Sequence, residues 1–188
     1  MQSTREKILD VVFKLVYIYG YTGTSMSMIL KECNIPKGSL YHHFKSKKDM
    51  VLAVIKERLS PRMDEFYELD VRDDKDGIDT VTEVILKVTQ KENLLVYGCP
   101  LNRLNQEMSH IDKDFEQHIN QIYEKIKTKI TNALQRSSMQ EDIDKSSLAS
   151  YIITTLWGVL SLSPSNSSKE QYLSSVQHLI NYLQSLKN

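Results

Sequence analysis

Basic and hydrogen-bonding side chains are concentrated between residues 37 and 48 of this 188-residue chain. Leu40 and Phe44 lie four residues apart, so a helix through this stretch would turn both inward. Its remaining surface would carry Ser39, Tyr41, His42 and His43, with Lys37 before it and Lys45, Lys47 and Lys48 after it. An outward face this polar and basic suits the groove of a nucleic-acid duplex, where base edges and phosphates accept hydrogen bonds.

The segments that must position this face predict a helix-turn-helix. Ser25 can cap the first helix, and apolar residues between 29 and 33 recur in it at helical spacing. The chain should turn near Asn34, because Pro36 disfavours a helical conformation at the residue before it. The second helix would then begin at residue 37 or 38.

Helical patterns continue through the rest of the chain, and strand patterns are almost absent. Ser3 and Glu6 form a possible capping box, and Gly20 is placed to end the first helix. A longer helix should run from Lys48 and either continue or bend at Pro61. Apolar stripes predict further helices over about 81–88, 100–108, 112–136, 148–159 and 173–183, with an acidic turn at 72–77 and the segment 164–168 between the last two. The predicted fold class is all-α, and the last two helices should form an antiparallel hairpin.

Composition excludes several classes of protein. With 40% apolar residues the chain suits one compact unit or two small ones. We expect a cytoplasmic location, because no apolar run reaches membrane-spanning length and no leader pattern opens the chain. Cys33 and Cys99 have no disulfide or metal-ligand spacing, and Gly-rich phosphate loops and helical His-Glu-x-x-His motifs are absent. No catalytic residue, cofactor or metal is therefore expected.

Charge is distributed unevenly although the formal net charge is zero. Residues 1–60 contain ten Lys and Arg against five Asp and Glu, a net charge of +5, which leaves −5 for residues 61–188. A basic head can approach phosphates while an acidic body is repelled. This asymmetry favours an oriented contact with double-stranded DNA.

The segment from Gly20 to Lys47 resembles the DNA-binding domain of the TetR family of bacterial regulators. The residues that carry the resemblance are Gly20-Tyr21-Thr22-Gly23-Thr24-Ser25 and Ile35-Pro36-Lys37-Gly38-Ser39-Leu40-Tyr41-His42-His43-Phe44-Lys45-Ser46-Lys47. The resemblance covers about a quarter of the chain and implies a three-helix DNA-binding domain over 1–47 and a helical effector-binding and dimerisation domain over 48–188. It also implies a ligand-responsive repressor of a palindromic operator.

The family's pattern assigns DNA contacts residue by residue. Lys37, Gly38, Ser39 and Tyr41 fall where the recognition helix enters the major groove, with Lys37 and Ser39 as readers of base edges. Tyr41, His43 and Lys47 match positions that hold the phosphate backbone, and His42 can reach either target. Ser25 and Ser27 are additional candidates, for which helix capping is the commoner role.

The resemblance further implies a homodimer formed through the last two helices, although their apolar stripes could instead fill the core of one chain. A two-fold dimer would place two recognition helices about 34 to 36 Å apart in successive major grooves. A small-molecule effector would stabilise an arrangement whose spacing no longer fits.

Candidate effector contacts combine apolar surface with a polar group. These residues are Tyr97, Cys99, His118, Tyr123 and Trp157. Cys99 would cap a helix that Pro100 opens, a position that favours a thiolate. Residues 98–101 resemble a Gly-Cys element of TetR-like regulators, a few of which sense electrophiles or oxidants, but the lysine that accompanies it there is replaced by Ser161-Leu162-Ser163-Pro164. A buried structural cysteine is the alternative.

Two other classes of function remain open from the sequence. An adaptor or co-regulator would keep the fold without binding DNA specifically, but the basic helix argues against it. A thiol-dependent enzyme would use Cys99 with His110 or His118, but no surrounding motif fixes these residues in place.

Overall fold

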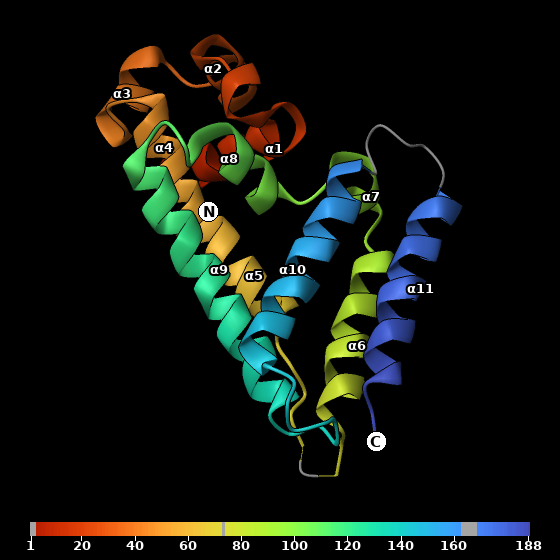
Figure 1. Ribbon diagram of the computed structural model, residues 1–188. Coiled ribbons are helices and arrows are strands. Elements are labelled where there is room, and N and C mark those ends of the chain that lie inside the picture. The colour runs from red at the N-terminus through yellow and green to blue at the C-terminus, as the bar shows by residue number, and fades with distance from the viewer. Residues whose placement is uncertain (1–2, 73, 163–168) are drawn as a thin grey trace. The chain divides into compact units, whose positions relative to one another are not determined.

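The computed structural model describes residues 3–72, 74–162 and 169–188. Over these residues the chain is helical, and an isolated bridge between Met139 and Lys187 is the one strand-type pairing among them. The predicted all-α class is confirmed. The helices in Figure 1 are α1 (Thr4–Gly23), α2 (Met26–Cys33), α3 (Lys37–His43), α4 (Lys47–Val54), the π-helix η1 (Ile55–Leu59), α5 (Ser60–Phe66), α6 (Gly77–Thr89), α7 (Glu92–Tyr97), α8 (Pro100–Met108), α9 (Lys113–Leu134), α10 (Lys145–Leu162) and α11 (Lys169–Ser185).

These helices pack into two compact units. Unit 1 contains residues 1–63 and 100–122, and unit 2 contains residues 64–99 and 123–188. The predicted division between residues 47 and 48 separates a DNA-binding domain from an effector-binding and dimerisation domain, and no packing boundary tests such a functional division. It stays a prediction.

In unit 1, α1 packs against α2, α4 and α8. Its buried side is apolar and includes Ile8, Leu9 and Val12. The predicted cap at the start of α1 is present, because the Ser3 hydroxyl accepts a hydrogen bond from the Glu6 amide at 3.2 Å. Regular helix stops at Gly20, as predicted, and one more turn follows to Gly23.

The helix that begins at Lys47 continues through Pro61 instead of bending there. A proline in a helix lacks an N–H group and its ring crowds the carbonyl four residues earlier. That carbonyl belongs to Glu57 and lies in η1, where the wider π-turn interrupts α-helical bonding. The Arg58 guanidinium donates to it instead, at 3.2 Å.

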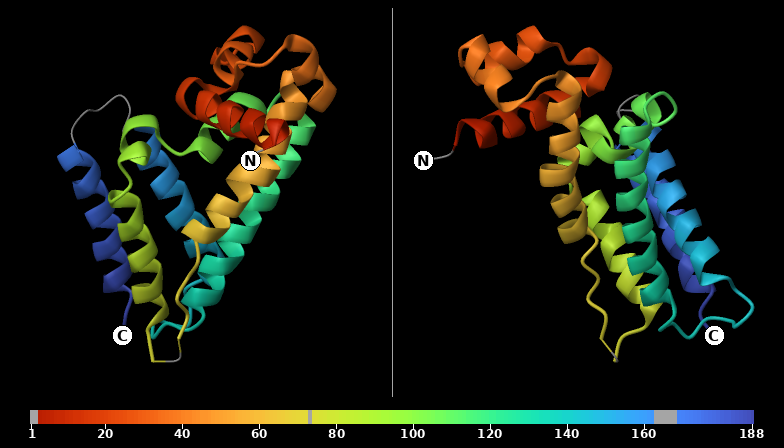
Figure 2. Two further views of the ribbon diagram at one scale, coloured as in Figure 1. Left: turned by 180° about the vertical axis from the view of Figure 1, so that it is seen from behind. Right: turned by 90° about the vertical axis from the view of Figure 1, so that its left-hand side faces the viewer.

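In unit 2, α11 packs against both α6 and α10, and the left view of Figure 2 shows the three helices next to one another. The predicted antiparallel pairing of α10 and α11 is visible in Figure 1. The predicted separator at 164–168 lies outside the described residues. Among the helices that the structure describes, none is long and apolar enough to cross a membrane.

Candidate DNA-binding site

The helix-turn-helix is built by local hydrogen bonds. The Ser25 hydroxyl accepts from the Met28 amide at 3.2 Å and caps α2. Asn34 ends α2 in the left-handed conformation with φ 49°, which its short polar side chain tolerates. Its amide donates to the carbonyls of Leu30 and Lys31 at 3.0 and 3.3 Å. Pro36 then precedes α3, so both the capped start and the turn agree with the sequence.

The inner face of α3 is anchored in the core of unit 1. Leu40 and Phe44 are buried there, as is Cys33 on α2. The Arg5 guanidinium lies over the Phe44 ring, 5.3 Å from its centroid. Because these contacts fix the rotation of α3, its opposite face is directed to solvent.

That outer face presents most of the predicted DNA-binding side chains. Lys37, Gly38, Tyr41 and His42 are exposed, whereas Ser39 and His43 are half-buried. A Cβ placed on Gly38 would meet nothing within 4 Å, so the backbone there is open to close approach. The Lys37 ammonium lies 5.8 Å from the centroid of the Tyr41 ring. The rings of His42 and His43 meet edge to face with centroids 5.3 Å apart.

Lys47 has a bonding role inside unit 1 that the sequence did not indicate. Its ammonium donates to the carbonyls of Tyr21 and Thr24, both at 2.9 Å, and lies 4.2 Å from the centroid of the Tyr21 ring. Burial lowers the pKa of Lys47, although the charge of Glu107 acts in the opposite direction. Lys47 thus joins the start of α4 to the last turn of α1 and to Thr24, and these bonds use two of its three N–H groups.

The two added serines bond to each other. The hydroxyl oxygens of Ser25 and Ser27 are 2.8 Å apart. Ser25 also caps α2, which is the commoner role for a serine at this position. Both residues are exposed, so a phosphate contact in addition to capping is compatible with their position.

Side chains of α8 bond the backbone of α1 on both sides of its break at Gly20. The sequence did not predict this role for them. The Arg103 guanidinium donates to the carbonyl of Ile18 at 3.0 Å, and the Glu107 carboxylate accepts from the Thr22 amide at 2.9 Å. These groups satisfy backbone atoms that Gly20 releases from the helix. No local pattern could have found them, because the partners are 85 residues apart.

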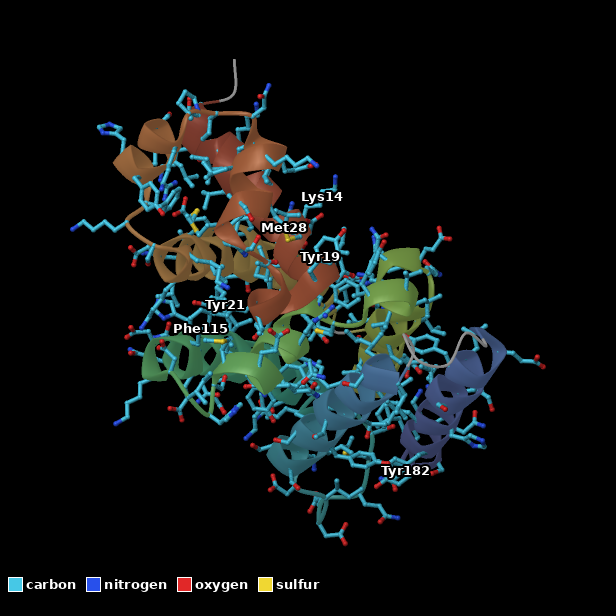
Figure 3. The ribbon with its side chains drawn as sticks, turned by 90° about the horizontal axis from the view of Figure 1, so that it is seen from above. Lys14, Tyr19, Tyr21, Met28, Phe115 and Tyr182 are labelled. Atoms are coloured by element: carbon cyan, nitrogen blue, oxygen red, sulfur yellow. The ribbon has the colours of Figure 1, made fainter. Side chains whose placement is uncertain are left out.

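The start of α9 supports the same part of unit 1. Lys48 forms ion pairs with Asp112 at 2.8 Å and Asp114 at 2.7 Å, and these two carboxylates raise the pKa of Lys48. The rings of Tyr21 and Phe115 meet edge to face with centroids 5.2 Å apart, and Figure 3 shows these two labelled residues beside each other. The helix-turn-helix therefore rests on residues from α8 and α9 as well as on α1.

The predicted effector contacts are only partly brought together. The rings of Tyr123 and Trp157 meet edge to face in unit 2, with centroids 5.7 Å apart. Tyr97 and Cys99 also belong to unit 2, whereas His118 belongs to unit 1 and its Nδ1 bonds the Asp114 carbonyl at 2.7 Å. Among the described residues, no group of three or more His, Cys, Asp or Glu is arranged to hold a metal ion.

An all-helical chain that presents an exposed, basic second helix from a helix-turn-helix defines a DNA-binding protein of the helix-turn-helix class. Residues 8–54 match the family model for bacterial regulatory proteins of the tetR family. An uncharacterized HTH-type transcriptional regulator of Lactococcus lactis is 32% identical over 136 residues, which span 71% of this chain and 69% of that protein. The chain belongs to the TetR family of bacterial transcriptional regulators.

Two further similarities extend over most of the chain. The HTH-type transcriptional regulator UidR of Escherichia coli K12 is 26% identical over 166 residues, or 85% of this chain and 81% of UidR. The crystal structure of the reduced form of E. coli NemR superposes with a TM-score of 0.80 at 21% identity, covering 95% of this chain and 97% of that one. The latter likeness shows the shared fold.

Proposed function

We propose that this DNA-binding transcriptional regulator is a ligand-responsive repressor that acts in the cytoplasm. In this proposal it binds a palindromic operator as a homodimer and is released by a small molecule. The observation that carries the proposal is the outer face of α3, which is basic and hydrogen-bonding while its inner face is anchored by Leu40 and Phe44. A rigid, solvent-exposed helix of this kind is what major-groove recognition requires.

The contacts divide between specificity and affinity. Lys37 and Ser39 read base edges, with guanine favoured opposite Lys37, because a lysine donates to the O6 and N7 acceptors of guanine. Tyr41, His43 and Lys47 hold phosphates, and His42 reaches either target. Ser25 and Ser27 add a phosphate contact at the start of α2.

The dimer forms through α10 and α11. Tyr151 and Tyr182 are 49% and 45% exposed, and their rings meet edge to face with centroids 5.6 Å apart. Leu162 and Leu173 are further exposed apolar residues of the same two helices. Exposed apolar side chains gathered on one pair of helices favour an interaction surface there, and a two-fold dimer matches the symmetry of a palindromic operator.

Release is geometric in this proposal. An effector stabilises an arrangement of the dimer in which the two α3 helices no longer fit successive major grooves. The effector can lower DNA affinity by no more free energy than the difference between its binding to the two arrangements of the dimer. Tyr97, Cys99, Tyr123 and Trp157 remain candidate contacts in unit 2, with His118 as the candidate from unit 1.

Fluorescence anisotropy of labelled DNA tests the proposal directly. Purified protein is titrated against the DNA upstream of its own gene and against a scrambled duplex, each at two salt concentrations. Saturable binding to the upstream DNA alone is expected, with an affinity that falls as salt rises. Weak and salt-sensitive binding to both duplexes would contradict a specific operator in that region and would favour the adaptor alternative.

A further inference from the structure

Two tyrosines of unit 2 are buried although each carries a hydroxyl group. Tyr67 follows α5 and is 6% exposed, and Tyr172 lies in the first turns of α11 and is 5% exposed. Buried tyrosine hydroxyls usually have a hydrogen-bond partner. A hydrogen-bond acceptor is therefore expected near each of the two hydroxyls.

The Tyr172 hydroxyl is the unsatisfied group. It is buried and has no hydrogen-bond partner among the residues that the structure describes. The other buried polar side chains that the structure describes in unit 2, Thr80 and Thr82, have hydrogen-bond partners. The Thr80 hydroxyl donates to the Asp76 carbonyl at 3.2 Å, and the Thr82 hydroxyl accepts from the Gln184 amide at 3.5 Å. An unpaired buried donor is unfavourable until an acceptor reaches it.

Tyr172 belongs to a cluster with Tyr67 and Cys99. Burial raises the pKa of Tyr67, and the nearby Cys99 thiol and Tyr172 phenol raise it further. Burial likewise raises the pKa of Tyr172. Both phenols are therefore neutral near pH 7, and the unpartnered Tyr172 hydroxyl is available as an O–H donor. The residue after α5, the first turn of α11 and the α7–α8 connection thus lie near one another in unit 2.

The residues of unit 2 favour an uncharged ligand at this cluster over a charged one. Among the described residues of unit 2, no Asp, Glu, Lys, Arg or His is buried, and most of the core is formed by aliphatic side chains of α6, α9, α10 and α11. A charged molecule would lose its hydration there without gaining a counter-ion. An apolar molecule with one acceptor oxygen would lose little and would satisfy the donor.

We propose that Tyr172 marks a binding site in unit 2 for a small, uncharged and largely apolar molecule with a carbonyl-type oxygen. That oxygen accepts the Tyr172 hydrogen bond beside Tyr67 and Cys99. The inference rests on the proposed function, to which it adds the chemical class of the effector. It also places two tyrosines at the site that do not belong to the contacts expected from the sequence.

Fluorine NMR of two matched probes tests this site on the full chain. The probes are 4′-fluoroacetophenone and 1-ethyl-4-fluorobenzene, which are similar in size and differ in the carbonyl oxygen. Saturable binding of the ketone is expected. In Tyr172→Phe, which keeps the ring and removes the hydroxyl, the Kd of the ketone should rise about threefold to tenfold, the value of one neutral hydrogen bond. The Kd of the ethyl compound should stay the same.

Tyr19→Phe is the matched control, because Tyr19 is an exposed tyrosine of α1 in unit 1, outside the proposed site. It should leave both Kd values unchanged. The thermal midpoint of Tyr172→Phe without probe should equal or exceed that of the wild type, since an unpaired hydroxyl is removed. Absence of saturable ketone binding to the wild type, or an equal Kd in Tyr172→Phe, would overturn the proposal.

The DNA titration is run separately and without probe. Loss of specific DNA binding together with a Tyr172-dependent ketone site would reject the regulator mechanism and leave the site intact. Specific DNA binding without ketone binding would reject the site alone. The two proposals therefore fail independently.

Discussion

At the scale of single residues, the side chains of α3 differ in how firmly they are held. Leu40 and Phe44 are buried, and Lys37 at the start of the helix is exposed, with its ammonium near the Tyr41 ring. A residue that is free to extend from a fixed helix can read a base without changing the fold. Lys37 is therefore the position at which sequence discrimination is best tested.

We expect Lys37→Ala to lose discrimination at one base position, by about 1 to 3 kcal/mol. The measurement is anisotropy with the operator and with single-base variants of each half-site. Lys45→Ala is the control, because Lys45 is exposed beyond the end of α3. An equal loss of affinity for the operator and for scrambled DNA would contradict the role of Lys37 as a base reader.

Lys47→Ala is expected to act in two ways. Affinity should fall alike for all DNA sequences, with a flatter salt dependence, because a phosphate contact carries no sequence information. The free energy of unfolding should also fall by about 1.5 to 3 kcal/mol, because the carbonyls of Tyr21 and Thr24 lose a charged donor. Urea unfolding measures the second effect, and an unchanged midpoint would contradict the structural role.

At the scale of helices, α1 depends on one backbone conformation. Gly20 has φ 77° and ψ 177°, a region that residues with a Cβ almost never adopt. A Cβ at this position would also lie 2.1 Å from the Glu107 carboxylate. The break lets the chain leave α1 and enter the helix-turn-helix at the required angle.

Gly20→Ala should therefore lower the free energy of unfolding by about 1 to 3 kcal/mol. Gly158→Ala provides the control, since an added Cβ there meets nothing within 4 Å and alanine favours a helix. Chemical unfolding of both variants gives the comparison. Equal stability of Gly20→Ala and the wild type would mean that the break does not require glycine.

A second test at this scale concerns the contact between α1 and η1. Arg5 donates to both carboxylate oxygens of Glu57, at 2.7 and 2.5 Å, and this lowers the pKa of Glu57. A lowered pKa stabilises the folded chain above the usual glutamate range, and the contribution is lost as pH falls through the folded-state value. The ion pair should therefore weaken in acid.

Glu57→Gln should be less stable than the wild type at pH 7 by roughly 0.5 to 1 kcal/mol, since the pair is partly exposed. The difference should narrow below about pH 4. Thermal unfolding at pH 7 and pH 3 measures it, with the exposed Glu124→Gln as control. A difference that is the same at both pH values would show that the charge of Glu57 is not the cause.

At the scale of the whole molecule, the proposed function depends on a second copy of the chain. Tyr151→Glu should raise the dimer Kd at least about tenfold, because a charge would enter an apolar interface. Light scattering after size exclusion measures the mass, and operator affinity should fall with dimer content. Ile111→Glu alters a residue of unit 1 that is 66% exposed and should leave the mass unchanged. A Tyr151→Glu protein that remains dimeric would place the interface elsewhere.

Much of the helical architecture followed from patterns that act over a few residues. Caps at Ser3 and Ser25, the turn before Pro36 and the start of α8 at Pro100 all appear where the sequence predicts them. The π-turn before Pro61 and the bonds of Lys47 did not follow from such patterns. A lysine looks the same in sequence whether its ammonium meets a phosphate or a backbone carbonyl.

The sequence by itself determined the helix-turn-helix, the basic face of α3 and the buried positions of Leu40 and Phe44, because capping, turn chemistry and helical periodicity are local. Only the tertiary structure decided which distant residues support that helix pair, such as Glu107 at the Thr22 amide. It also showed that the Tyr172 hydroxyl is buried without a partner among the described residues. Such contacts depend on how helices pack, and packing brings together residues that no local pattern connects.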